Sequence, residues 1–143
     1  MIRKILLVST IALSSFNATA ECKQVNILNE TKTVATYNIT TAKTPEKRAR
    51  GLMFIKNMPV DTGMLFIWPN DYREKTMWMK NTFISLDMVF VKDLEIVGII
   101  ENTVPQSLDI LTIGKPSDKV LELNAGEVKD KKIKVGNRIS CNK

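Results

Sequence analysis

The sequence predicts a mostly β fold, and three observations lead to this prediction. Short apolar or alternating runs recur along the chain, turn residues separate most of them, and only one segment carries a helix start signal. We therefore expect a single-domain antiparallel β-sandwich or partly open barrel with one short α-helix.

The expected strands are short, and polar residues lie between them. The first two are Gln24 to Leu28 and Val34 to Ile39, with a turn at residues 29–31. Further strands are expected at residues 64–68, 76–80, 88–92, 96–100, 109–113, 120–123, 133–135 and 138–141.

One helix is expected at residues 45–53. Thr44 can cap its first turn, and Pro45 suits the first helical position because that residue needs no N–H partner. Leu52 and Met53 fall on one helical face together with Ala49, so this face should pack on the sheet.

The first twenty residues have the pattern of a secretory signal. Arg3 and Lys4 precede an apolar run at residues 5–13, and Ala18-Thr19-Ala20 resembles a cleavage site. We expect a cleavable signal peptide at residues 1–20 and a single mostly β domain at residues 21–143, which is periplasmic or secreted. The apolar run is short for a stable membrane span, but its retention as an N-terminal anchor remains the alternative.

Two cysteines, Cys22 and Cys141, lie at the two ends of the expected mature chain. An even cysteine count in an exported protein favours a disulfide, and this bridge would close almost the whole domain. A redox or metal-binding pair is the alternative, although the Cys-x-x-Cys spacing that supports it is missing from the sequence.

The composition excludes several classes of chemistry. The chain contains no histidine, which excludes Ser-His and Cys-His catalysis and the usual histidine-containing zinc sites. Its formal net charge is +6, but the late lysines are not interleaved with aromatic residues, so we do not expect nucleic acid as a partner. We expect no cofactor.

A cluster of polar and charged residues stands among apolar neighbours in the middle and late parts of the chain. Buried polar groups are costly without partners, so these residues form either a ligand-binding site or an internal network in which Asp87 and Glu122 neutralise Arg50 and Lys80. The cluster consists of Arg50, Trp78, Lys80, Asn81, Thr82, Asp87 and Glu122.

Six motifs occur in the order that characterises one family. They are Arg48-Ala49-Arg50-Gly51-Leu52-Met53, Gly63-Met64-Leu65-Phe66, Trp78-Met79-Lys80-Asn81-Thr82, Leu86-Asp87, Val120-Leu121-Glu122 and Ala125-Gly126. With these motifs the chain resembles the Domain of Unknown Function 192 family, also called uncharacterised protein family 0127, from about residue 31 to residue 139. The resemblance implies a compact, mostly β sandwich with a short helix, often exported or membrane-anchored. It implies no established activity.

Two specific chemistries are compatible with the sequence. Asp87 and Glu122 are candidate catalytic residues of a carboxylate-dependent hydrolase that acts on a carbohydrate, with a tryptophan as stacking surface. Met77 and Met79 lie on one face of an expected strand and are candidate Cu(I) ligands, because soft thioethers suit this ion. Methionine is also a versatile core filler, which is the simpler explanation of both residues.

We favour a binding or accessory module over an enzyme. In this interpretation Arg50, Lys80, Asn81 and Thr82 contact a small polar ligand, a glycan or an envelope protein. The sequence does not distinguish these partners from one another.

Overall fold

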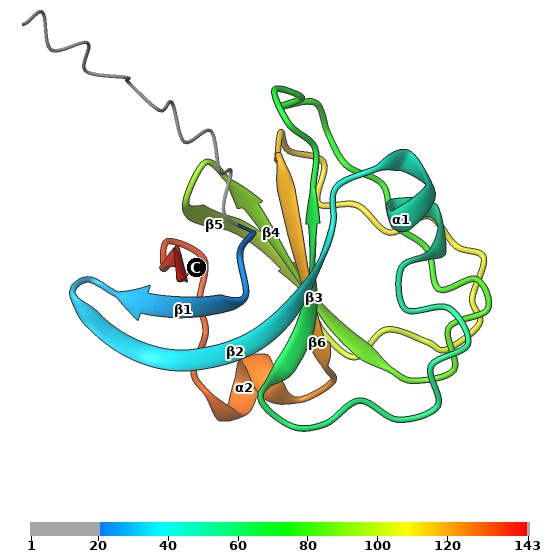
Figure 1. Ribbon diagram of the computed structural model, residues 1–143, viewed down its shortest axis with the longest axis horizontal. Helices are drawn as coiled ribbons and strands as arrows, with labels where there is room; N and C mark the ends of the chain where they lie inside the picture. Colours follow the sequence, from blue (N-terminus) through cyan, green and yellow to red (C-terminus); the bar gives the residue numbers. More distant parts are fainter. Residues whose placement is uncertain (1–20, 143) are drawn as a thin grey trace, which may run out of the picture.

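A computed structural model describes residues 21–142, which form a closed barrel of seven strands (Figure 1). The order around the barrel is β1-β2-β3-β6-β4-β5-β7, and β7 pairs back onto β1. The strands are β1 (Gln24–Asn29), β2 (Lys32–Ala42), β3 (Thr62–Ile67), β4 (Leu86–Lys92), β5 (Glu95–Ile100), β6 (Lys119–Asn124) and β7 (Arg138–Asn142). The expected signal peptide lies outside the described residues.

The prediction of a mostly β fold is confirmed, with a closed barrel in place of the partly open one. Most neighbouring strands are antiparallel, but β2 and β3 are parallel, because the chain crosses over between them through α1 (Pro45–Arg50). A second short helix, α2 (Glu127–Asp130), precedes β7. The expectation of one helix is therefore corrected to two within residues 21–142.

Three of the expected strands do not form. Residues 76–80 and 109–113 share only an isolated bridge between Met77 and Leu111, and residues 133–135 lie in an irregular segment. Met77, Met79, Leu111 and Ile113 of the first two segments pack on the outside of the barrel instead of extending its hydrogen-bonded ladder. A run of apolar residues shows burial, but it does not show which backbone will pair with it.

Helix α1 starts where the sequence predicts and ends three residues earlier than Met53. The Thr44 hydroxyl accepts a hydrogen bond of 3.2 Å from the Lys47 N–H, as an N-cap should. Gly51 ends the helix with a φ of 47°, and a β-carbon at this position would lie 2.9 Å from the Phe66 ring. Glycine is therefore required both by the turn and by the close approach to β3.

Apolar side chains pack on both faces of the sheet. Opposite residues of an antiparallel pair point to the same face, and neighbours along a strand point to opposite faces. Val89 and Leu121 point into the barrel, where they join the interior core. Phe90 and Val120 point outward and form an outer core, which the segment after α1 and other long loops cover. Figure 1 shows these loops gathered on the side of the barrel where α1 lies.

The predicted disulfide joins Cys22 to Cys141, with Cα atoms 5.6 Å apart. It links the segment before β1 to β7, beside the antiparallel pairing of these two strands. The bridge therefore ties together the first and last strands of the barrel. None of the helices in the described part of the chain is long and apolar enough to cross a membrane.

Candidate functional site

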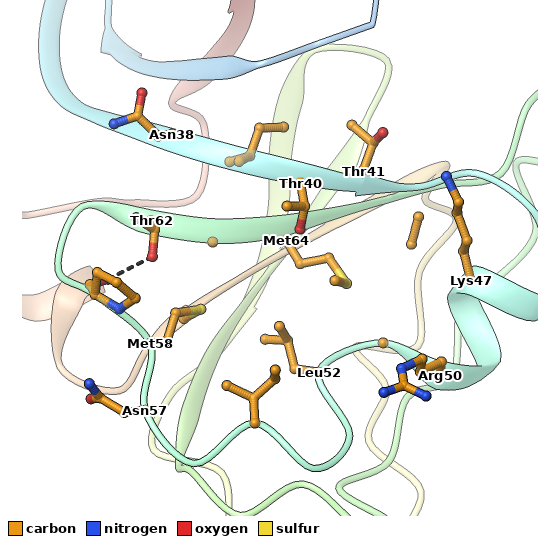
Figure 2. Close-up of a pocket in the computed structure, with 16 residues that line it drawn as sticks. Asn38, Thr40, Thr41, Lys47, Arg50, Leu52, Asn57, Met58, Thr62 and Met64 are labelled. Carbon is orange, nitrogen blue, oxygen red and sulfur yellow. Dashed lines mark hydrogen bonds between the residues drawn. The ribbon is translucent and has the colours of Figure 1, made fainter.

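A cleft of about 720 Å³ lies on the outer face of the parallel pair β2 and β3 (Figure 2). Its floor includes Thr40 of β2 and Met64 of β3, whose side chains point away from the barrel interior. Its wall is the segment of residues 51–59 that follows α1, with Leu52, Ile55 and Met58 in the lining. The parallel crossover therefore creates the cleft, because it carries a loop back over the two strands that it connects.

Hydrogen bonds to other parts of the fold hold this wall in place. The Asn124 side chain donates a hydrogen bond of 3.0 Å to the Met58 carbonyl, and the Phe54 N–H donates one of 2.9 Å to the Asn81 carbonyl. These contacts anchor the middle and the far end of the wall, so that the cleft is preformed.

The two ends of the cleft differ in charge. Lys47 and Arg50 line one end, and the amides of Asn38 and Asn57 lie at the other, as Figure 2 shows. No aspartate or glutamate lines the cleft, and neither cation forms an ion pair within residues 21–142. The middle is apolar, so the cleft is electrostatically complementary to an apolar molecule with an anionic group at one end.

A second, much smaller cavity of about 30 Å³ adjoins the cleft at residues 50–52, which line both hollows. We call it the Glu122 cavity. Five residues of the predicted polar cluster line it: Arg50, Trp78, Lys80, Thr82 and Glu122. These residues come from three of the six sequence motifs, so the fold brings together segments that are far apart in the chain.

Glu122 has no partner among the described residues. Its side chain lies on the outer face of β6, between Met64 of β3 and Met88 of β4, and only 4% of the residue is exposed. It forms neither a side-chain hydrogen bond nor an ion pair within residues 21–142. Burial raises the pKa of its carboxyl group to about 8, so Glu122 is mainly a neutral acid at pH 7.

The ion pairs expected inside the polar cluster are not formed among the described residues. The Arg50 guanidinium lies 6.0 Å from the centre of the Phe54 ring, and the Lys80 ammonium lies 5.0 Å from the Trp78 ring. Both side chains lie over aromatic rings and extend to the surface, where their charged groups remain hydrated. The internal network is therefore not built from these cations.

Asp87 is buried on the opposite face from Glu122. Its carboxylate accepts hydrogen bonds of 2.9 Å from Asn102 N–H, 2.9 Å from Gly126 N–H and 3.0 Å from Val128 N–H. Asp87 therefore fastens the loop after β5 and the start of α2 to the barrel. This is a structural role.

The expected catalytic pair is not brought together. Asp87 is opposite Leu123 and Glu122 is opposite Met88, which places the two carboxyl groups on different faces. Among the residues that the structure describes, no other carboxylate lines the cleft or the Glu122 cavity. The acid and base that a glycosidase of this kind needs are therefore separated by the sheet.

Asn81 and Thr82 form a turn. Asn81 has a φ of 52°, and its carbonyl receives the Phe54 N–H described above. The Thr82 hydroxyl donates 3.1 Å to the Lys80 carbonyl. Thr82 borders the Glu122 cavity, but its hydroxyl group is already engaged.

The two candidate copper ligands do not meet at one hollow. Met77 lines the Glu122 cavity, whereas Met79 is fully buried in the outer core and lines neither hollow. Residues 21–142 contain no group of three or more histidine, cysteine, aspartate or glutamate residues that could hold a metal ion. The geometry places both methionines in packing contacts.

Sequence reasoning missed most of the cleft. Lys47, Thr40 and Ile55 carry no signal of their own, because each looks like an ordinary residue of a helix, strand or loop. Met64 belongs to a recognised motif, but only the parallel pairing of β2 and β3 brings it beside Thr40.

These features define a small closed β-barrel with a ligand-sized cleft on its outer face. The chain belongs to the DUF192 family, described as "Uncharacterized ACR", whose model matches residues 26–141. The predicted family is therefore confirmed.

Two solved structures are similar to the chain. A protein from Sinorhizobium meliloti 1021, assigned as a candidate transcription regulator, is 38% identical, with a TM-score of 0.78; the match covers 82% of this chain and 92% of that one. A protein of unknown function from Novosphingobium aromaticivorans DSM 12444 is 30% identical, with a TM-score of 0.77 and coverage of 82% and 83%. None of the curated proteins matches the sequence.

Proposed function

We propose that this protein is an exported binding module that takes a small amphipathic anion in its cleft. The observation that carries the proposal is the lining, which has an apolar centre, two cations at one end and, within residues 21–142, no carboxylate. The volume of about 720 Å³ lies within the usual range for small-molecule sites.

Two independent features support export. The signal-like pattern at residues 1–20 would direct the chain out of the cytoplasm, and the Cys22–Cys141 bridge is stable in an oxidising compartment. In this interpretation the protein meets its ligand outside the cytoplasm.

The lining narrows the range of ligands expected from the sequence. A glycan would place hydroxyl groups against Leu52, Met58 and Met64, which offer no side-chain hydrogen-bond partner of comparable strength. An apolar chain or ring would fill this region, and a carboxylate, sulfonate or phosphate group would meet Lys47 and Arg50. An amphipathic anion therefore fits better than a carbohydrate.

The test uses 8-anilinonaphthalene-1-sulfonate, an apolar anion whose fluorescence reports binding, with the mature oxidised protein. Thr40→Trp fills the cleft floor, and Thr36→Trp is the matched control on the same outward face of β2, outside the cleft. We expect Thr40→Trp to weaken binding about tenfold or more and Thr36→Trp to leave it unchanged.

Equal binding by the two variants would contradict the proposal, provided that both retain the wild-type unfolding transition. Binding of the probe by the wild type only under partly denaturing conditions would also contradict the proposal, because this dye binds exposed core residues as well.

A further inference from the structure

Three loops of the outer layer lie side by side. Three backbone hydrogen bonds connect them: Phe54 N–H to the Asn81 carbonyl (2.9 Å), Gln106 N–H to the Thr82 carbonyl (2.9 Å) and Met79 N–H to the Ser107 carbonyl (3.1 Å). These bonds join residues 51–55, 78–83 and 104–111 into one continuous layer over the outer core.

Large apolar side chains on this layer face the solvent. Six of them are 40% to 73% exposed, and we call them the apolar loop surface: Phe54, Trp78, Phe83, Val104, Leu108 and Ile110. Phe54 and Phe83 also contact each other edge to face, with ring centres 6.1 Å apart. Exposed apolar residues that gather in this way mark an interaction site more often than single ones do.

Cations accompany the aromatic residues of this surface. Arg50 lies beside Phe54 and Lys80 lies beside Trp78, so a cation lies next to two of the three exposed aromatic rings of this surface. The three loops with α1 and its flanks carry six cations, Lys43, Lys47, Arg48, Arg50, Lys56 and Lys80, and two acids, Glu46 and Asp109. The layer is therefore both apolar and positively charged.

We propose that the apolar loop surface docks onto an anionic lipid membrane. Aromatic rings with adjacent lysine or arginine suit the boundary between lipid tails and phosphate groups, because the ring packs against the tails and the cation contacts the phosphate groups. The excess of cations favours an anionic leaflet. A second copy of the chain would instead bring the same positive charges face to face, which is unfavourable.

This docking goes beyond the proposed binding of a small ligand. Ile55 lies directly after Phe54 and lines the cleft, so the apolar loop surface continues into the cleft wall. A docked protein would hold its cleft beside the membrane. The two proposals are tested separately, because cleft binding needs no lipid surface.

The experiment measures co-sedimentation of the mature oxidised protein with vesicles. Vesicles of phosphatidylglycerol and phosphatidylethanolamine are compared with vesicles of phosphatidylcholine, at low and at high salt. We expect binding to the first, weakened by salt, and about tenfold weaker binding to the second.

Variants identify the surface. Phe83→Ser combined with Leu108→Ser removes two of its apolar groups, and we expect the vesicle affinity to fall about tenfold or more. The matched control is Leu94→Ser combined with Val135→Ser, which changes comparably exposed apolar residues in the β4–β5 turn and the segment before β7. The control should bind vesicles like the wild type.

A spectroscopic measurement complements sedimentation. The chain contains two tryptophans, so Trp68→Phe leaves Trp78 as the single reporter within the apolar loop surface. We expect its emission to shift to shorter wavelength when anionic vesicles are added. Absence of vesicle binding at low salt, equal losses in the two double variants, or a dimer that only the Phe83/Leu108 variant disrupts would each overturn the proposal.

Discussion

Asp87 and Glu122 lie on neighbouring strands, but their side chains point to opposite faces of the sheet. The Asp87 carboxylate accepts hydrogen bonds from three backbone N–H groups, whereas the Glu122 carboxyl group accepts none within residues 21–142 and borders a cavity. One acid therefore stabilises the fold, and the other is buried at a cost to stability. A group kept in such a position is a candidate for function, as perturbed acids often are.

Glu122→Gln should stabilise the protein at neutral pH. Its pKa is raised from 4.5 to about 8 in the folded state, so the folded protein binds this proton more tightly than the unfolded chain. The free energy of unfolding of the wild type should therefore fall as pH rises from about 4.5 to 8, by up to roughly 5 kcal/mol. At pH 7 the variant should be about 3 kcal/mol more stable, because glutamine does not ionise.

Denaturant unfolding of both proteins between about pH 5 and pH 9 measures this difference. Glu101→Gln, which changes an exposed glutamate, is the control and should follow the wild-type pH profile. A variant that is less stable than the wild type at pH 7 would show that the Glu122 carboxylate has a stabilising partner.

Asp87→Asn should destabilise the fold. The carboxylate accepts three N–H groups, and an amide would direct its own N–H groups at some of these donors. We expect a loss of about 2 to 4 kcal/mol in the free energy of unfolding. Asp109→Asn on the exposed loop is the control, and similar small losses in both variants would refute the structural role of Asp87.

The Cys22–Cys141 bridge should contribute to the stability of the barrel without forming the cleft. The bridge spans 119 residues of sequence and lies apart from the cleft lining. Replacing both cysteines by serine should lower the free energy of unfolding by about 2 to 5 kcal/mol. The affinity for 8-anilinonaphthalene-1-sulfonate should be unchanged at temperatures where the variant is folded. If the folded variant no longer bound the probe, the disulfide would be required for the cleft, which would contradict this prediction.

The sequence predicted a strand correctly where the pattern of apolar residues coincides with a segment whose backbone pairs with its neighbours. β4 and β6 are buried on both faces and consist largely of apolar residues, so the sequence identified them as strands without knowledge of the neighbouring strand. Residues 76–80 have the same apolar character, yet they lie outside the ladder, because the outer core also needs apolar cover. Tertiary packing decides whether such a segment joins the sheet or covers it, and local strand propensity carries no information about tertiary packing.

The candidate site was predicted only in part. Glu122, Trp78 and Lys80 were found because each is out of place in its local pattern. The cleft was missed, because Lys47 and Thr40 become neighbours only through the parallel crossover. A topology with one parallel pair could not be read from an apparently antiparallel succession of short strands.

Lys47→Gln combined with Arg50→Gln should weaken the binding of anions to the cleft. Both side chains lie at one end and form no ion pair within residues 21–142, so their removal leaves no unpaired buried acid. We expect an affinity loss of about tenfold, equivalent to roughly 1.4 kcal/mol, measured by calorimetry with decanoate. The unfolding free energy should change little, and Lys129→Gln combined with Lys132→Gln controls for the net charge.

The most direct test of an anion-selective cleft compares two amphiphiles that differ in the sign of their charge. Decanoate and decyltrimethylammonium carry similar apolar chains, and each is titrated against the mature protein with bound 8-anilinonaphthalene-1-sulfonate. We expect decanoate to bind about tenfold more tightly in this displacement assay, because Lys47 and Arg50 line the cleft without an acid among the described lining residues. Equal affinities, or tighter binding of the cation, would contradict the assignment of the cleft as an anion-binding site.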